Sequence, residues 1–383
     1  MASLQQLLQP NVLTKTISRV AGMSDWLAVL FGVQPGGKNV LNFGHGRTGA
    51  YHIYNNVRKV ARGRTPGTAA GRRAPNPMGR VTFDYPRMHD SVSLLAEMLH
   101  NLAKISDPTV RDAAGADMLS RQTDTLAQLA ANWRKAMLVG MLRDSLYIGI
   151  EGDDMFFDFE ATAGVLPVLQ AHARMPAGNK NQLNMTGTGN IINASWSTAT
   201  TNIPNHLGQI NAAFQQICGG HLNSIIVPWA VWNNVIVNEF VAAIHGSANA
   251  PFKVLERESV ESELAKSMKN VFRAELNVLP GVTWYITDEG LEIGKPGSET
   301  FKKIVPDTNA LFVGTDPSGG AIACYEGSEP IAEYDNGPET VKTGLASWSV
   351  KRSNPTSTEL YVLDNALVTN HVPASTAFGT VIF

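Results

Sequence analysis

Apolar residues recur at helical spacing through residues 107–143, the longest uninterrupted pattern in the chain. Leu119, Leu126 and Trp133 are seven residues apart, and the apolar positions between them complete one stripe with a polar reverse face. An aspartate followed by a proline opens the pattern, which suits an N-cap and a first helical position. At about 1.5 Å per residue, the predicted helix is on the order of 50 Å long. We therefore expect a strut with Leu119, Leu126 and Trp133 in its core, Trp133 being the most buried.

Alternating apolar and polar residues predict strands on both sides of this helix. Before it, residues 38–44, 50–63 and 80–86 are strand-like, and residues 90–105 are amphipathic with apolar positions mostly three residues apart. After it, residues 145–159 contain two apolar runs around the turn sequence EGDD, which predicts a β-hairpin.

An α/β pattern begins near residue 203. Residues 204–220 predict a helix that ends at two glycines, and further helices are expected over residues 229–246 and 259–272. Buried strands are expected at the sequences SIIVP, GVTWYIT, NALFVGT and AIACYEG. Residues 336–383 alternate again, so we expect them to rejoin the sheet of the first domain. Residues 200–335 would then form an inserted domain.

Composition and charge indicate a globular protein without a membrane span and with a basic N-terminal region. The chain has 383 residues, of which 44% are hydrophobic and 17% charged, so it can bury a large core. It contains no run of about 18 apolar residues, which predicts no membrane span. No secretory signal is expected, and two cysteines fit a reducing cytoplasm. Residues 1–90 carry a net charge of +9 and the remainder −11. The basic region could bind nucleic acid or lie across the acidic body of a neighbouring copy.

Residues 32–80 are unlike the rest of the chain, because they contain ten glycines and no acidic residue from position 38 onward. The segment has too few large apolar residues to build a core of its own. We therefore expect a long hairpin that projects from the body of the protein and needs the surface of a partner to become ordered. The residues we expect at such a contact are the basic ones: Arg47, Arg58, Lys59, Arg62, Arg64, Arg72, Arg73 and Arg80.

Patterns that would indicate catalysis are incomplete. Gly32 to Lys38 matches most of a phosphate-binding loop, but Asn39 stands where Ser or Thr would hold magnesium, and no helix is predicted to follow. Residues 44–49 match a dinucleotide fingerprint, but no acidic residue lies about 20 positions further on. The histidines lack metal-ligand spacing. We expect no catalytic, cofactor-binding or metal-binding residues, and a nucleotide-binding enzyme remains the least favoured alternative.

The order of these segments resembles the major capsid proteins of tailed bacteriophages, within them the lambda-type capsid protein E group. Residues 101–148, with their Asp-Pro-initiated helix, carry the resemblance, as do ELNVLPGVTWYITDEG, IVPDTNALFVGTDPSGGAIACYEG and the closing residues 347–383. The resemblance covers most of residues 80–383. Residues 36–80 match only by position and composition.

The resemblance implies an α+β tailed-phage major capsid fold. Its expected parts are an N-terminal arm (1–35), an extended β-hairpin loop (36–90), a peripheral domain (91–199) with a spine helix (107–143), an axial α/β domain (200–335) and return strands of the peripheral domain (336–383).

The implied function is that of a structural protein, not an enzyme. Such a chain self-assembles into hexamers and pentamers of an icosahedral head shell that encloses double-stranded DNA. Its partners would be itself and packaged DNA held non-specifically at the inner surface, with no membrane and no cofactor. Portal and decoration proteins would be separate chains, and a scaffold would be a separate protein or absent. It would be part of the virion and assembled in the bacterial cytoplasm. The alternative is a cellular compartment shell of the same fold that encloses a protein cargo.

Overall fold

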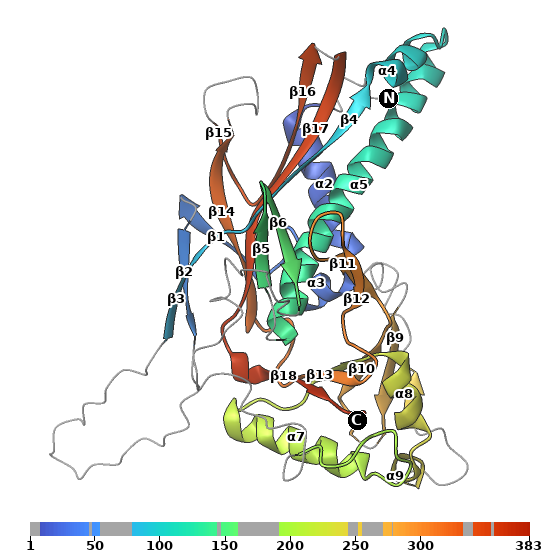
Figure 1. Cartoon of the computed structure of the whole chain (residues 1–383), viewed down its shortest axis with the longest axis vertical. Coiled ribbons are helices and arrows are strands. Elements are labelled where there is room, and N and C mark those ends of the chain that lie inside the picture. The colour runs from blue at the N-terminus through green and yellow to red at the C-terminus, as the bar shows by residue number, and fades with distance from the viewer. Residues whose placement is uncertain are drawn as a thin grey trace, which may run out of the picture.

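The structure is a computed structural model that describes residues 8–45, 48–53, 79–143, 147–159, 191–243, 252–254, 271–277, 279–331, 340–353 and 356–383. The molecule is elongated (Figure 1). A long helix runs beside a long sheet, and a second, more compact sheet lies at one end with its own helices.

The elongated sheet is organised around the fifteen-residue strand β17 (Thr356–Asn370). Its other members are β1 (Val40–His45), β4 (Arg87–Leu95), β14 (Ile322–Ile331), β15 (Thr340–Thr343) and β16 (Leu345–Ser353). The first half of β17 lies between β16 and β4, and its second half pairs with β14. β14 also pairs with β1 and β15. Strands from both ends of the chain therefore share one sheet.

The helix predicted over residues 107–143 is present as α5 (Pro108–Arg143) and packs against β17 (Figure 1). Leu119 and Leu126 are buried, at 4% and 0% exposure. The expectation that Trp133 is the most buried residue is wrong: it is only partly buried, with its ring centroid 4.2 Å from that of Phe157. The reason is that the C-terminal part of α5 is enclosed on several sides, so that residues 134–142 are all buried.

The N-terminal segment packs onto this framework through α2 (Pro10–Ser24) and α3 (Trp26–Phe31). Apolar residues of α2 share a buried cluster with α5. At the edge of β16, the Thr14 hydroxyl donates to the Ser347 carbonyl (3.1 Å) and accepts from the Ser347 amide (2.9 Å). One edge of β16 pairs with β17. Thr14 of α2 therefore provides hydrogen-bond partners for the backbone groups of Ser347, which β17 does not pair.

Residues 90–105 do not form the single amphipathic element that their spacing suggests. β4 continues to Leu95, and only α4 (Ala96–Ala103) is helical. Val92 and Leu94 fit the two-residue period of a strand as well as the longer period of a helix. β4 pairs with β17 in a continuous antiparallel ladder. Pairing with a distant strand therefore overrides the local pattern.

The compact sheet has six strands, mostly antiparallel, with a parallel pair at its centre. Their order is β18 (Thr376–Thr380), β13 (Asn309–Val313), β7 (Ser224–Val227), β10 (Thr283–Ile286), β9 (Phe272–Leu276) and β8 (Phe252–Val254). The helices beside it are α7 (Ile203–Ile217), α8 (Trp229–Ile236) and α9 (Glu239–Ala243), and a short 3-10 helix, η1 (Pro373–Ser375), precedes β18.

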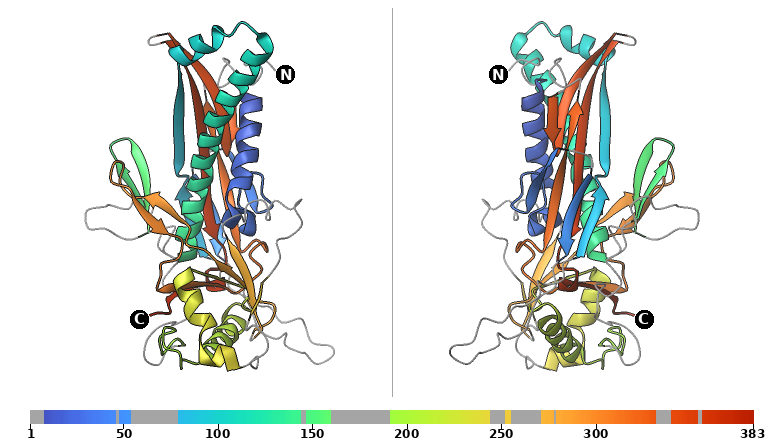
Figure 2. Two further views of the ribbon diagram at one scale, coloured as in Figure 1. Left: turned by 90° about the vertical axis from the view of Figure 1, so that its right-hand side faces the viewer. Right: turned by 90° about the vertical axis from the view of Figure 1, so that its left-hand side faces the viewer.

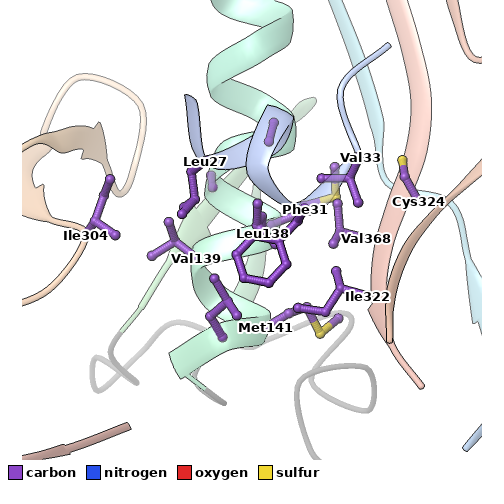
Figure 3. Close-up of a cluster of buried hydrophobic side chains, with 14 of the residues drawn as sticks. Leu27, Phe31, Val33, Leu138, Val139, Met141, Ile304, Ile322, Cys324 and Val368 are labelled. Atoms are coloured by element: carbon purple, nitrogen blue, oxygen red, sulfur yellow. The ribbon is translucent and has the colours of Figure 1, made fainter. Parts of the chain in front are cut away.

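The central strands β7, β10 and β13 of the compact sheet are buried on both faces, which explains why their sequences are nearly continuously apolar. On β7, Ile225 and Val227 belong to a cluster that includes Phe214 of α7 and Trp232 of α8. Ile226, which points to the opposite face, belongs to the cluster built by α3 and the end of α5. Figure 3 shows this second cluster, where side chains of α3, α5, β14 and β17 converge.

Several expected boundaries are corrected by the strand pairing. β18 pairs with β13 and so completes the compact sheet rather than returning to the elongated one. β14 belongs to the elongated sheet, although it falls within residues 200–335. The helix expected over residues 229–246 divides at Asn238, whose side-chain oxygen accepts from the backbone of α9. The helix expected at 259–272 lies largely outside the described residues, and β9 occupies its last position.

Three two-stranded ribbons complete the described fold. They are β2 (Thr48–Ile53) with β3 (Gly79–Asp84), β5 (Tyr147–Glu151) with β6 (Asp154–Asp158), and β11 (Gly290–Ile293) with β12 (Thr300–Lys303). The hairpin after α5 is thus confirmed, but it is a sheet by itself and is not extended by the C-terminal strands as expected.

Candidate functional site

Two consecutive basic residues lie buried in the middle of the molecule, near the C-terminal end of α5. The first, Arg134, is fully buried. Its Nε donates to Oδ2 of Asp364 (2.7 Å) and its Nη2 to Oδ1 (2.8 Å), so the pair is bidentate. The same Nη2 donates to Oε1 of Glu326 (2.7 Å), and Nη1 reaches the Val33 carbonyl (3.4 Å). Arg134 therefore ties α5 to β17, β14 and the segment after α3.

Lys135 is equally buried but faces other parts of the chain, because successive residues of a helix point about 100° apart. Its ammonium pairs with Oδ1 of Asp25 (3.2 Å) and with Glu289, which lies between β10 and β11. The Trp26 indole donates to the second oxygen of Glu289 (2.7 Å). Asp25 also accepts from the Leu27 and Ala28 amides and so caps α3. Lys135 thus joins α5 to α3 and to the compact sheet.

Each buried cation has two carboxylates, so the network has more acidic than basic groups. Burial raises the pKa of Asp25, and the charge of Lys135 offsets this only in part. Burial likewise raises the pKa of Glu326, against the opposing effect of Arg134. Burial alone would lower the pKa of Arg134, but Asp364 and Glu326 together raise it well above its usual value. Asp25 and Glu326 therefore take up protons more readily than free carboxyl groups do.

The network suits a structural role. Truncating one partner of a buried ion pair costs about 3–5 kcal/mol because the other charge is stranded. Here the partners of Arg134 lie 192 and 230 positions away in the sequence, so the pairs fix the mutual register of distant segments. The arrangement fixes α5 in one position relative to β14 and β17.

The two phosphate-binding patterns do not form cradles. Gly32 ends α3 in the left-handed conformation (φ 68°), and its amide donates back to the Val29 carbonyl. The Asn39 side chain donates to the Phe31 carbonyl (2.6 Å). Residues 32–38 therefore form a turn at the C-terminal end of a helix, whereas phosphate binding uses an N-terminal end. The second pattern, residues 44–49, runs into the strands β1 and β2, again without a helix in the described part.

The described part of the chain also lacks other site signatures. It holds no group of three or more His, Cys, Asp or Glu placed to bind a metal ion. None of its helices is long and apolar enough to cross a membrane.

Of the basic residues assigned to contacts, only Arg80 lies within the described residues, where it is exposed on β3. The other seven, Arg47, Arg58, Lys59, Arg62, Arg64, Arg72 and Arg73, lie outside them. The sequence reasoning missed Arg134 and Lys135. Their signal was a pair of basic residues within the otherwise apolar run from Trp133 to Leu142.

Comparison with known proteins gives a likeness of fold. No protein-family model matches the chain, and no curated protein matches it. A solved structure described as a capsid protein of a prophage in Escherichia coli CFT073 is similar, with a TM-score of 0.55 and 12% identity over 98% of this chain and 99% of that one. A phage-related protein from Bordetella bronchiseptica RB50 is similar with a TM-score of 0.52 and 9% identity over 98% and 97%. The chain therefore has the tailed-phage capsid fold, as the sequence predicts.

Proposed function

We propose that this chain is a major capsid protein that self-assembles into the icosahedral head shell around the double-stranded DNA of a tailed phage. The supporting observation is the likeness to the E. coli prophage capsid protein along almost the whole of both chains. The buried network on α5 fits this role, because a shell subunit needs a rigid framework that presents fixed surfaces to its neighbours.

In this proposal the elongated sheet with α5 is the peripheral domain, and the compact sheet is the axial domain around which hexamers and pentamers form. The basic residues of segment 36–90 contact a neighbouring copy. Any scaffolding, portal or decoration protein is a separate chain, and DNA contacts the inner surface without sequence preference. The protein is then a component of the virion, assembled in the cytoplasm of a bacterial host, with no cofactor and no catalytic step.

The test is to express the full chain, purify it and measure particle size by light scattering, with negative-stain microscopy of the same sample. We expect closed shells of uniform diameter. A chain that stays monomeric at all protein and salt concentrations would contradict the proposal. Particles from the native host should contain nuclease-protected DNA, and a protein cargo in its place would favour the compartment shell instead.

A further inference from the structure

Residues 191–202 cross the compact part of the molecule without forming a helix or a strand, and we call them the strap. The Trp196 amide of the strap donates to the Val381 carbonyl, directly after β18 (2.8 Å). The Ala199 carbonyl accepts from the Asn238 side chain, between α8 and α9 (2.9 Å). Figure 2 shows the C-terminal end of the chain beside the helices of the compact part. The strap therefore joins that end of the chain to those helices.

The strap is attached to α7 through a buried histidine. His206 lies in the first turn of α7 and is 4% exposed. The Trp196 indole N–H donates to its Nδ1 (3.1 Å), and its Nε2 lies 3.1 Å from the Asn193 side-chain oxygen. The Trp196 ring is itself buried and meets Phe312 of β13 edge-on, with 6.2 Å between the ring centroids. One histidine ring therefore holds an apolar anchor and a polar residue of the strap.

These contacts fix the protonation state of His206. An indole N–H can only donate, so Nδ1 of His206 must offer a lone pair and the ring is neutral. Nε2 then carries the proton and donates to the Asn193 oxygen. A second proton, on Nδ1, would set two donors against each other and break the contact with Trp196. The strap can stay attached in this way only while the histidine is uncharged.

The surroundings of His206 do not compensate a positive charge. The strap, the remainder of α7, β13 and η1 contain no other titratable residue. α9, which packs against α7, contributes Glu239, and this residue is exposed. Burial therefore lowers the pKa of His206 below its ordinary value. Its contribution to stability is complete above about pH 6.5 and is lost as the pH falls below that value.

A second buried histidine has a different arrangement of partners. Nδ1 of His371 lies 2.8 Å from the His52 carbonyl oxygen, which can only accept, and Nε2 lies 3.1 Å from the Tyr325 hydroxyl. Burial lowers the pKa of His371 as well. A hydroxyl can either donate or accept, so Tyr325 can turn its proton away when His371 becomes charged. His371 can thus take up a proton without losing either contact, whereas His206 cannot.

We propose that His206 is an acid-sensitive switch, in which uptake of a proton releases the Trp196 indole and opens the strap while the elongated part of the fold stays closed. Opening uncovers Trp196 and the side of the apolar cluster that it covers. The switch is a property of the compact part alone and does not depend on the proposed shell function.

Hydrogen exchange of the full chain, measured by mass spectrometry and corrected for intrinsic exchange rates, tests the opening. Amides of the strap should exchange about tenfold faster near pH 5 than near pH 7, since one proton can shift the equilibrium up to tenfold per pH unit. Peptides of β17 and those around His371 should exchange at the same corrected rate at both pH values. Equal protection of the strap at both pH values, or equal acceleration along the whole chain, would overturn the proposal. Light scattering checks that the assembly state is the same at both pH values.

His206→Asn removes the titration and keeps a side-chain acceptor near the position of Nδ1. The strap of this variant should therefore be equally protected near pH 5 and near pH 7. The matched control is His221→Asn, at an exposed position of the same compact part, which should keep the wild-type response. Acid-induced opening that persists in His206→Asn, or disappears in His221→Asn, would show that another group is responsible.

Asn193→Asp separates a switch from a contact that only stabilises the fold, and it stands by itself if His206→Asn does not fold. A carboxylate beside Nε2 favours the charged ring, so the midpoint of strap opening should rise by about one pH unit or more. A contact with a purely structural role would change protection equally at every pH and leave the midpoint where it is. An unchanged or lower midpoint in Asn193→Asp would overturn the assignment to His206.

Discussion

The elongated and compact parts of the molecule are stabilised in different ways. The compact sheet is buried on both faces by apolar residues, and the strands β7, β10 and β13 come from a limited stretch of the chain, residues 224–313. The elongated part joins segments from residues 8–45, 87–143 and 322–370, and charged groups lie at its centre. Apolar burial is strong but not directional, whereas a bidentate ion pair specifies one geometry. Charged pairs therefore occur where distant segments must meet in one register.

The largest expected effect is that of Arg134→Met. This change leaves the buried Asp364 and Glu326 without a cation, so we expect a loss of about 3–5 kcal/mol in the free energy of unfolding. Chemical denaturation measures it. The control Arg121→Met removes an exposed pair with Asp117 and should cost less than about 1 kcal/mol. Similar small losses in both variants would contradict a structural role for the network.

Lys135→Met should cost less, about 1–3 kcal/mol. Glu289 is 34% exposed, so water can solvate it when the lysine is absent. Asp25 keeps its hydrogen bonds from the α3 amides. The same denaturation assay compares the two adjacent positions. A loss equal to that of Arg134→Met would show that the two cations are equivalent.

Stability should depend on pH through Glu326 and Asp25, whose folded-state pKa values are raised mainly by burial. A raised carboxyl pKa stabilises the folded state fully below the unfolded pKa, near 4, and this contribution is lost as the pH rises through the folded pKa. Glu326→Gln should therefore become more stable relative to wild type as the pH rises, by at most about 1.4 kcal/mol per pH unit. Thermal melts of both proteins, taken at a series of pH values from about 4 upward, measure the difference in stability between Glu326→Gln and wild type. A difference that shrinks with rising pH would contradict the assignment.

The smallest expected effect lies in the compact sheet. Ile225→Val removes one methylene from a fully buried position and should cost about 0.5–1.5 kcal/mol, independent of pH and salt. Denaturation at low and high salt checks this. A loss of stability that depends on salt would contradict the conclusion that the compact sheet is stabilised by apolar burial rather than by charge.

The sequence predicts elements whose pattern is local and uninterrupted. α5 follows from its apolar stripe, the β5–β6 hairpin from a turn sequence between two strands, and α7 from its glycine stop. The tailed-phage capsid fold follows from the order of these elements rather than from any one motif.

Long-range pairing explains what the sequence does not predict. β4 is a strand because β17 pairs with it, and β18 completes the compact sheet because β13 pairs with it. Arg134 and Lys135 belong to a residue class that is mostly exposed, and the four carboxylates that let them be buried are far away in the chain. A buried charge cannot be inferred until its partners are placed.

The measurement that tests the account most directly is a cryo-electron microscopy reconstruction of the particles formed by the full chain. The account predicts a closed icosahedral shell built from this chain. Only monomers, or open and irregular aggregates, would contradict it.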